Sequence, residues 1–202
     1  MAEEANAQQV LRLCLDLNVW IGDLLARRSR PRGLRITAGR RLVQAAMDGR
    51  FEGIPVQTVV SWGMLNRLRS VLSGLAVDNA MGNMLIDSII GSATLGPEGS
   101  APYLLLGGAG VLAMHDEEDR HVLEVARATR AHVLATANFR DFSTKDSEIL
   151  LADRVCIDPS PNWDVVVALP QEVAGWLRRG IFPSAVNVRN AILKRPGPTP
   201  LA

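Results

Sequence analysis

Short apolar runs alternate with helical patterns along most of the chain, and three of these runs end on a polar residue. In "LRLCLDLNVWIGDLLA", residues 11–26, a compact apolar run reaches Asp16, and apolar residues at helical spacing follow it. The segment "IPVQTVVSWGMLNRLRSVLSG" repeats this order, and "HVLAT" is a further apolar run that ends at Thr136. Strands that alternate with helices favour a parallel sheet, so the order predicts an α/β fold.

The length of the chain and a change in composition predict how it is divided. A chain of 202 residues is long enough for one sizeable core. After Asp158 the sequence changes to "DPSPNW", then to two short helical segments, and finally to a proline-rich end. The sequence therefore predicts one main domain over residues 11–157 and a C-terminal extension over residues 158–202.

The overall charge gives no reason to expect a strongly basic nucleic-acid binder. Lys and Arg number 22 and Asp and Glu number 21, while 48% of the residues are hydrophobic, which is typical of a globular protein. Any contact with nucleic acid must come from a local patch. The most common reading of the arginine-rich segment after residue 26 is a solvated loop and helix, but it is also the best candidate for holding an RNA backbone. Its candidate residues are Arg27, Arg28, Arg30, Arg32, Arg40 and Arg41.

The sequence also predicts a cytoplasmic protein. Its longest apolar stretches, such as residues 103–114, are shorter than a bilayer-crossing helix and contain glycines. The first residues are acidic and polar, unlike a signal peptide. Cys14 and Cys156 lie in short apolar runs, which indicates buried free thiols in a reducing setting.

Several acidic residues are placed where they could share one edge of the predicted sheet. Ligands of an open parallel sheet gather beyond the carboxyl ends of its strands. Asp16 ends the first predicted strand, Asn138 and Asp141 follow a later one, and Asp116 and Asp119 stand at the start of a helix. Oxygen ligands without a Cys/His set favour Mg²⁺ or Mn²⁺, and such a site suits phosphodiester hydrolysis.

The order of three segments carries a family resemblance. The segments "CLDLNVW", "VVSWGMLNRLRSVL" and "DEEDRHVLEVARATRAHVLATANFRDF" together resemble the PIN-domain family over roughly residues 11–157. This family consists of metal-dependent ribonucleases and includes the toxins of bacterial VapBC-type toxin-antitoxin pairs. The resemblance implies a three-layer α/β/α fold with a central parallel sheet, an RNA substrate, bound Mg²⁺ or Mn²⁺, an antitoxin partner and a homodimer.

The resemblance also implies roles for particular residues. Asp16 matches the first metal-binding aspartate of the family, and Asn18 matches the asparagine beside it. Asp119 matches the acid that opens the later helix-and-strand unit, with Asp116 as a second acid next to it. Thr136 matches the small hydroxyl residue after that strand.

The last ligand position and two others depart from the family pattern. Asn138 stands where many members have an aspartate, and Asp141 is expected to compensate as a metal ligand and catalytic acid. The helix that should carry a glutamate has Asn66 and Arg67 there, and Leu17 replaces the usual hydroxyl residue. These departures keep open a second hypothesis, a catalytically impaired PIN-fold protein that binds RNA or a partner.

Other readings of the same residues also stay open. The acids at 116–119 could simply cap a helix and offset its dipole, without binding a metal. Such capping contributes about 0.3 to 1 kcal/mol per favourable charge. His115 and His121 are expected to be a loop residue and a solvent-facing helix residue, because neither has a partner at ligand spacing. In a third hypothesis, Asp16 belongs to a phosphoryl-transfer site of another doubly wound fold.

Overall fold

The computed structural model describes residues 9–29, 36–97, 104–105, 117–161 and 163–194. Its strands are β1 (Leu11–Leu15), β2 (Arg50–Phe51), β3 (Ile54–Ser61), β4 (Leu104–Leu105), β5 (Val133–Ala135), β6 (Glu148–Leu151), β7 (Val155–Asp158) and β8 (Val165–Ala168). Its helices are α1 (Leu17–Ser29), α2 (Ala38–Asp48), α3 (Trp62–Gly74), α4 (Asn79–Leu95), α5 (Glu117–Ala128), α6 (Phe139–Phe142), α7 (Pro170–Arg178) and α8 (Ala185–Leu193).

The strands form a mixed sheet whose centre is parallel. The strand order is β2-β3-β1-β5-β8-β7-β6, and β4 pairs with β3 outside this path. The neighbours β3, β1, β5 and β8 are parallel to one another, whereas β2, β7 and β6 pair antiparallel at the two sides. The predicted α/β fold with a central parallel sheet is confirmed, with antiparallel strands added at both sides.

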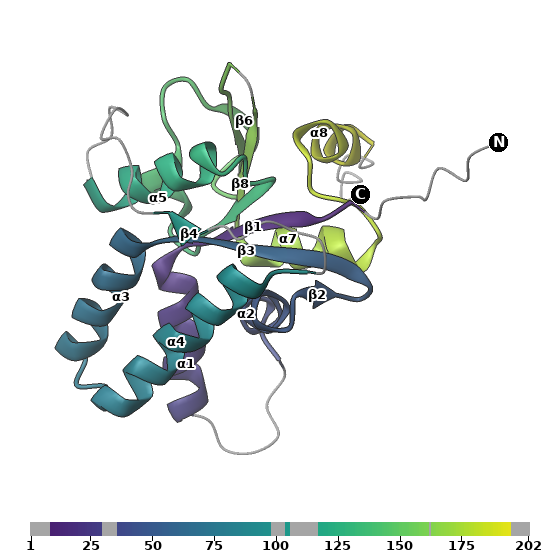
Figure 1. Cartoon of the computed structure of the whole chain (residues 1–202). Helices are drawn as coiled ribbons and strands as arrows, with labels where there is room; N and C mark the ends of the chain where they lie inside the picture. Colours follow the sequence, from purple (N-terminus) through teal and green to yellow (C-terminus); the bar gives the residue numbers. More distant parts are fainter. Residues whose placement is uncertain (1–8, 30–35, 98–103, 106–116, 162, 195–202) are drawn as a thin grey trace, which may run out of the picture.

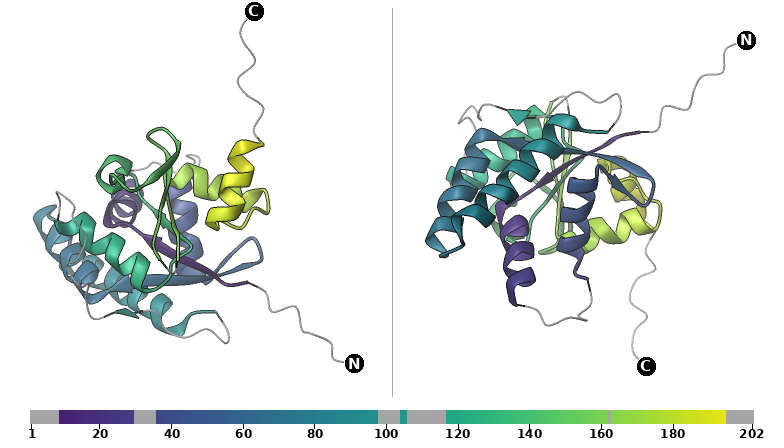
Figure 2. Two further views of the ribbon diagram at one scale, coloured as in Figure 1. Left: turned by 90° about the horizontal axis from the view of Figure 1, so that it is seen from above. Right: turned by 60° about the horizontal axis from the view of Figure 1, so that its bottom comes forward.

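Helices cover both faces of the sheet, which gives three layers. In the view of Figure 1, α1, α2, α3 and α4 lie below the central strands, and α5 and α8 lie above them. The other views in Figure 2 show that α7 lies next to α2. Contacts agree with it, because α2 packs against α1, α4 and α7, whereas α5 packs against α6.

The central strands are apolar because both of their faces are covered. Every residue of β5 and β8 is fully buried, and so are Leu11, Leu13 and Cys14 of β1. Burying apolar surface contributes about 25 cal/mol per Å² removed from water, so these strands contribute strongly to stability. Continuous apolar runs are typical of parallel strands covered on both sides.

The residues after Asp158 supply part of this core. The strand β8, which the composition change did not predict, lies between β5 and β7. Two helices follow, close to the two helical segments expected there, and Trp176 of α7 is fully buried. The sheet is therefore built from both sides of the boundary predicted at residue 158.

Two observations concern the setting of the chain. Both cysteines are free thiols in the core, as expected, and burial raises the pKa of Cys156 to about 12. Among the helices of the described ranges, none has the length and apolar character needed to cross a bilayer.

Candidate functional site at the carboxyl edge of the sheet

Three neighbouring strands end side by side in polar residues. The parallel register pairs Cys14 with Val59, and continuing it by two residues brings Asp16 level with Ser61. On the other side, Leu15 pairs with Ala135, so Thr136 lies next to Asp16. Adjacent strands are about 4.8 Å apart, which places these three polar side chains along one edge.

Hydrogen bonds tie Asp16 to the end of β5. The Asp16 Oδ2 atom accepts hydrogen bonds from Thr136 Oγ1 at 2.7 Å and from Asn18 Nδ2 at 2.5 Å. Asn18 then spans to the neighbouring strand, since its Oδ1 accepts a bond from the backbone N–H of Ala137 at 3.0 Å. The two supporting residues predicted for this site therefore contact its first carboxylate directly.

Asp16 is an acid in an unfavourable place for a charge. Its side chain is buried, with 4% of the residue exposed, at the start of α1. Burial raises the pKa of Asp16 above its ordinary value, and the hydrogen bonds from Thr136 and from Asn18 lower it again in part. A cation bound beside Asp16 would favour the ionised form of this acid, because a nearby positive charge lowers the pKa of a carboxyl group.

Asn138 and Asp141 form a second polar pair beside the first. The backbone N–H of Asn138 donates to Thr136 Oγ1 at 3.0 Å, which places this residue directly beyond the hydroxyl that binds Asp16. Its side-chain amide donates to Asp141 Oδ2, one turn further along α6. Both side chains are exposed. The structure therefore places these two predicted ligands next to the Asp16 cluster.

The two acids expected at the start of α5 are described only in part. Asp116 lies outside the described residues, and for Asp119 only the backbone position in the first turn of α5 is described. This helix packs against β3, β5 and α3.

One contact at this edge was not predicted from the sequence. His121 of α5 is half-buried, and its Nε2 atom lies 2.8 Å from Ser61 Oγ, so the expectation of a solvent-facing side chain was wrong. Ser61 also caps α3, since its hydroxyl accepts a bond from the backbone N–H of Met64. Gly63 makes room for the ring, because a Cβ atom there would overlap His121 Nε2. A serine at a strand end with a glycine two residues later was the only sequence signal.

The missing glutamate of α3 has no substitute on the buried side of that helix. Its buried residues are Met64, Leu65, Leu68 and Leu72, and both Asn66 and Arg67 are exposed. The helix contains no acidic residue over its whole length. A carboxylate from α3 is therefore not available to this edge.

Asp16 is the described residue of this edge that would hold a divalent cation. Asp16 offers a buried carboxylate oxygen whose charge a cation would balance, and the neighbouring amide and hydroxyl groups are oxygen donors suited to Mg²⁺ or Mn²⁺. Within the side chains that the structure describes, no three His, Cys, Asp or Glu residues lie close enough to form a metal group. Further ligands would have to come from the first turn of α5 or from Asp141.

Two of the arginines predicted to bind RNA lie away from this edge. Arg27 and Arg28 are in the last turn of α1, about 16 Å along the helix from its start beside Asp16. Arg27 also pairs with Asp23 at 2.5 Å. Arg40 and Arg41 lie in the first turn of α2, and Arg30 and Arg32 are outside the described residues.

Comparison with known proteins agrees with this geometry. The model of one family, described as the PIN domain, matches residues 12–140 and so covers Asp16, Ser61, Thr136 and Asn138. No curated protein and no solved structure matches the chain. Because the match spans well over half of the 202 residues, the chain belongs to the PIN domain family.

Proposed function

We propose that this protein is a Mg²⁺- or Mn²⁺-dependent endoribonuclease that hydrolyses RNA phosphodiester bonds. PIN domains are generally nucleases and typically use divalent metals. The observation that carries the proposal is the buried Asp16 carboxylate, held by Thr136 and Asn18 at the edge where parallel sheets bind their ligands.

Asp16 would hold the cation, and Asp119, Asp116, Asp141 and Asn138 are the proposed further ligands and catalytic acids. A bound divalent cation would balance the negative charge of the phosphate and lower the pKa of the attacking water. Thr136 and Asn18 both donate hydrogen bonds to Asp16 Oδ2 and so hold the Asp16 carboxylate in one orientation. The predicted arginines would attract the RNA backbone at longer range.

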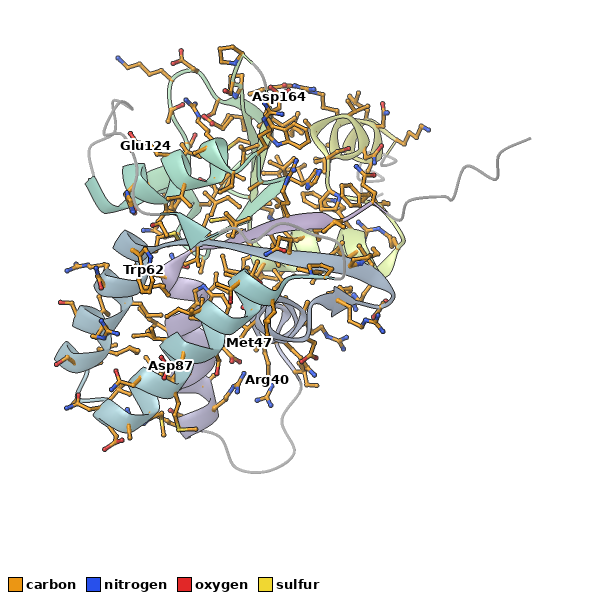
Figure 3. All side chains as sticks on the ribbon, in the orientation of Figure 1. Arg40, Met47, Trp62, Asp87, Glu124 and Asp164 are labelled. Atoms are coloured by element: carbon orange, nitrogen blue, oxygen red, sulfur yellow. The ribbon has the colours of Figure 1, made fainter. Side chains whose placement is uncertain are left out.

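The first experiment is a calorimetric titration of Mn²⁺ into the wild-type protein and into Asp16→Asn, with a total-RNA cleavage assay on the same samples. Asp87→Asn is the matched control, because Asp87 is an exposed acid on α4 (labelled in Figure 3). We expect Asp16→Asn to lose both Mn²⁺ binding and cleavage, and the control to keep both. A wild-type protein that neither binds Mn²⁺ nor cuts RNA would reject the proposal.

A second candidate is a PIN-fold protein that binds RNA or a partner without turnover. The absence of any acid on α3 favours it. Arg67→Glu tests the difference, since it returns a carboxylate to the helix that lacks one. A gain of Mn²⁺ affinity or of cleavage would indicate a degenerate site, whereas cleavage by the wild type that Asp16→Asn abolishes would exclude this candidate.

We further propose that the protein acts as the toxin of a toxin-antitoxin pair and forms a homodimer. Its buried thiols are consistent with a reducing, cytoplasmic setting. Expression of the wild type in a bacterial host is expected to arrest growth, and Asp16→Asn is expected to relieve the arrest. Sedimentation of the purified protein would test the dimer. Normal growth under expression would contradict the toxin role without touching the nuclease chemistry.

A further inference from the structure

The exposed side of α3 carries an aromatic residue right at the carboxyl edge of the sheet. Trp62 is 38% exposed, whereas the other Phe and Trp side chains in the described part of the chain are half-buried or buried. Its indole N–H forms no hydrogen bond with any residue in the described ranges. Figure 3 labels Trp62 at the first turn of α3, where β3 ends. An exposed Trp has a large apolar face that is costly to leave in water.

The backbone of Trp62 is held in place close to Asp16, the proposed catalytic acid. It directly follows Ser61, which is level with Asp16 on the adjacent strand, about 4.8 Å away across the pair. The Ser61 hydroxyl bonds both to His121 Nε2 and to the first turn of α3. The Trp62 indole is therefore attached to a backbone position that is held in place, one residue beyond the edge of the sheet.

Polar and basic residues continue the same helix face. Asn66 and Arg69 follow Trp62 at spacings of four and three, which places the three side chains in a row on one face of a helix. Both are exposed, and the helix has no acidic residue. Arg69 lies about 10 Å along the axis from Trp62, closer to the edge than the arginines at the end of α1. It also lines a pocket of mixed polar and apolar character together with Asp78, Asn79 and Asn83 at the start of α4.

We propose that this face of α3 binds a single-stranded segment of the RNA substrate, with an unpaired base stacked on Trp62 and a phosphate paired with Arg69. The proposal rests on the ribonuclease function above and adds the two residues of α3 that would hold the strand. A base in a duplex has no free face for the indole, whereas an unstacked base does. A single aromatic followed by an amide and a cation suits a nucleotide better than a protein partner, which would need a wider apolar patch.

The test measures RNA binding in the Asp16→Asn background, without metal, so that cleavage plays no part. Fluorescence anisotropy gives the Kd for a short mixed-sequence single strand and for the same strand in a duplex. Trp62→Ala is expected to weaken single-strand binding about 5- to 100-fold, the usual range for loss of one base stack. Trp62→Phe should restore much of the affinity, because it keeps an aromatic face.

Two matched variants separate this face from general surface effects. Met84→Ala removes another exposed apolar side chain on α4, and Arg179→Ala removes an exposed arginine after α7. Both should leave the Kd unchanged, whereas Arg69→Ala should weaken binding and reduce its dependence on salt.

The outcomes are distinct. Unchanged single-strand affinity in Trp62→Ala, equal losses for single strand and duplex, or no RNA binding by the parent protein would each overturn the proposal. An affinity for a copurifying protein that depends on Trp62, with RNA binding intact, would assign the face to a protein partner instead. Failure of the ribonuclease function would be seen in the cleavage assay, which this binding measurement does not use.

Discussion

The Thr136 hydroxyl connects the two halves of the candidate site. It donates to Asp16 Oδ2 and accepts bonds from the backbone N–H of Asn138 and, at 3.3 Å, from Asn18 Nδ2. The residue is fully buried, so water cannot replace these bonds once the hydroxyl is gone. The family resemblance could predict a small hydroxyl residue here, but only the tertiary structure shows that it joins two strand ends.

Thr136→Val should therefore lower the free energy of unfolding by about 1 to 3 kcal/mol, the cost of leaving a buried polar group without its partner. It should also weaken Mn²⁺ binding, because Asp16 loses its shortest tie to β5. Urea unfolding and calorimetric titration measure the two effects. Thr94→Val is the control, since Thr94 is exposed on α4 and bonds only to its own helix. Equal stability of the two variants would contradict this role.

His132 is buried in a form that acid should disturb. Its Nδ1 atom accepts a hydrogen bond from the Arg12 backbone N–H at 3.0 Å, so the ring is neutral there. Trp163 and Phe182 pack edge-on against it at 5.0 and 4.8 Å between ring centroids. Burial and then the Arg12 charge lower the pKa of His132 from 6.5 to about 4.

The unfolded chain therefore takes up a proton at His132 between pH 6.5 and about 4, while the folded protein does not. Stability should be fully present above pH 6.5 and fall as the pH drops towards 4, by about 2 to 3 kcal/mol from this residue. Urea unfolding at pH 7.5 and 4.5 would measure the loss. His132→Asn keeps an acceptor for Arg12 but does not titrate, so its loss should be smaller by that amount. Parallel pH profiles for the two proteins would refute the assignment.

At the scale of elements, the three strands that end beside Asp16, Ser61 and Thr136 could be predicted from the sequence, whereas β2 and β8 could not. The runs before Asp16, Ser61 and Thr136 are apolar and are followed by helical spacing, which is a strong local signal. The two-residue β2 pairs with β3 across a tight turn, and its sequence is too short to carry any period. The Val-rich β8 follows the stretch "DPSPNW", and the composition of that stretch suggested that the main domain ends before β8.

The contact between α3 and α5 depends on one glycine. An alanine at Gly63 would push the His121 ring away, and the bond to Ser61 would be lost. Gly91, inside α4, has open space around it, so Gly91→Ala should stabilise the protein by about 0.5 to 1 kcal/mol through helix propensity. Gly63→Ala should lack this gain and destabilise by about 1 kcal/mol. Thermal unfolding of both variants measures the contrast, and an equal gain at both sites would show that the His121 contact contributes nothing.

At the scale of the whole molecule, the sequence could predict the edge but not how the side chains meet there. Asp16 and Asn138 were predicted because each follows a strand of a parallel sheet, and parallel strands end at one edge. Thr136 was predicted because the family resemblance implies a small hydroxyl residue there. The Ser61–His121 contact joins residues 60 positions apart, and no local pattern encodes that distance. The exposure of Trp62 is likewise a property of the folded surface rather than of its segment.

The division predicted at residue 158 can be tested by truncation. A chain that ends at Asp158 lacks β8, so the backbone groups of β5 and β7 that pair with it would be left without partners. It also lacks the fully buried Trp176 and Val188. We expect this truncated chain to lose cooperative unfolding. The free-energy cost of leaving two buried strands without their partner exceeds the small net stability of a typical domain.

Circular dichroism during thermal and urea unfolding would measure this loss of cooperativity. Arg189→Ala is the comparison, because it removes only the exposed ion pairs of α8 with Glu148 and Asp164. Such pairs contribute at most about 1 kcal/mol, so this variant should still unfold in a single sharp transition. A sharp transition and a folded spectrum for the truncated chain would instead show that residues 11–157 form an independent domain and that β8 is added to a sheet already complete without it.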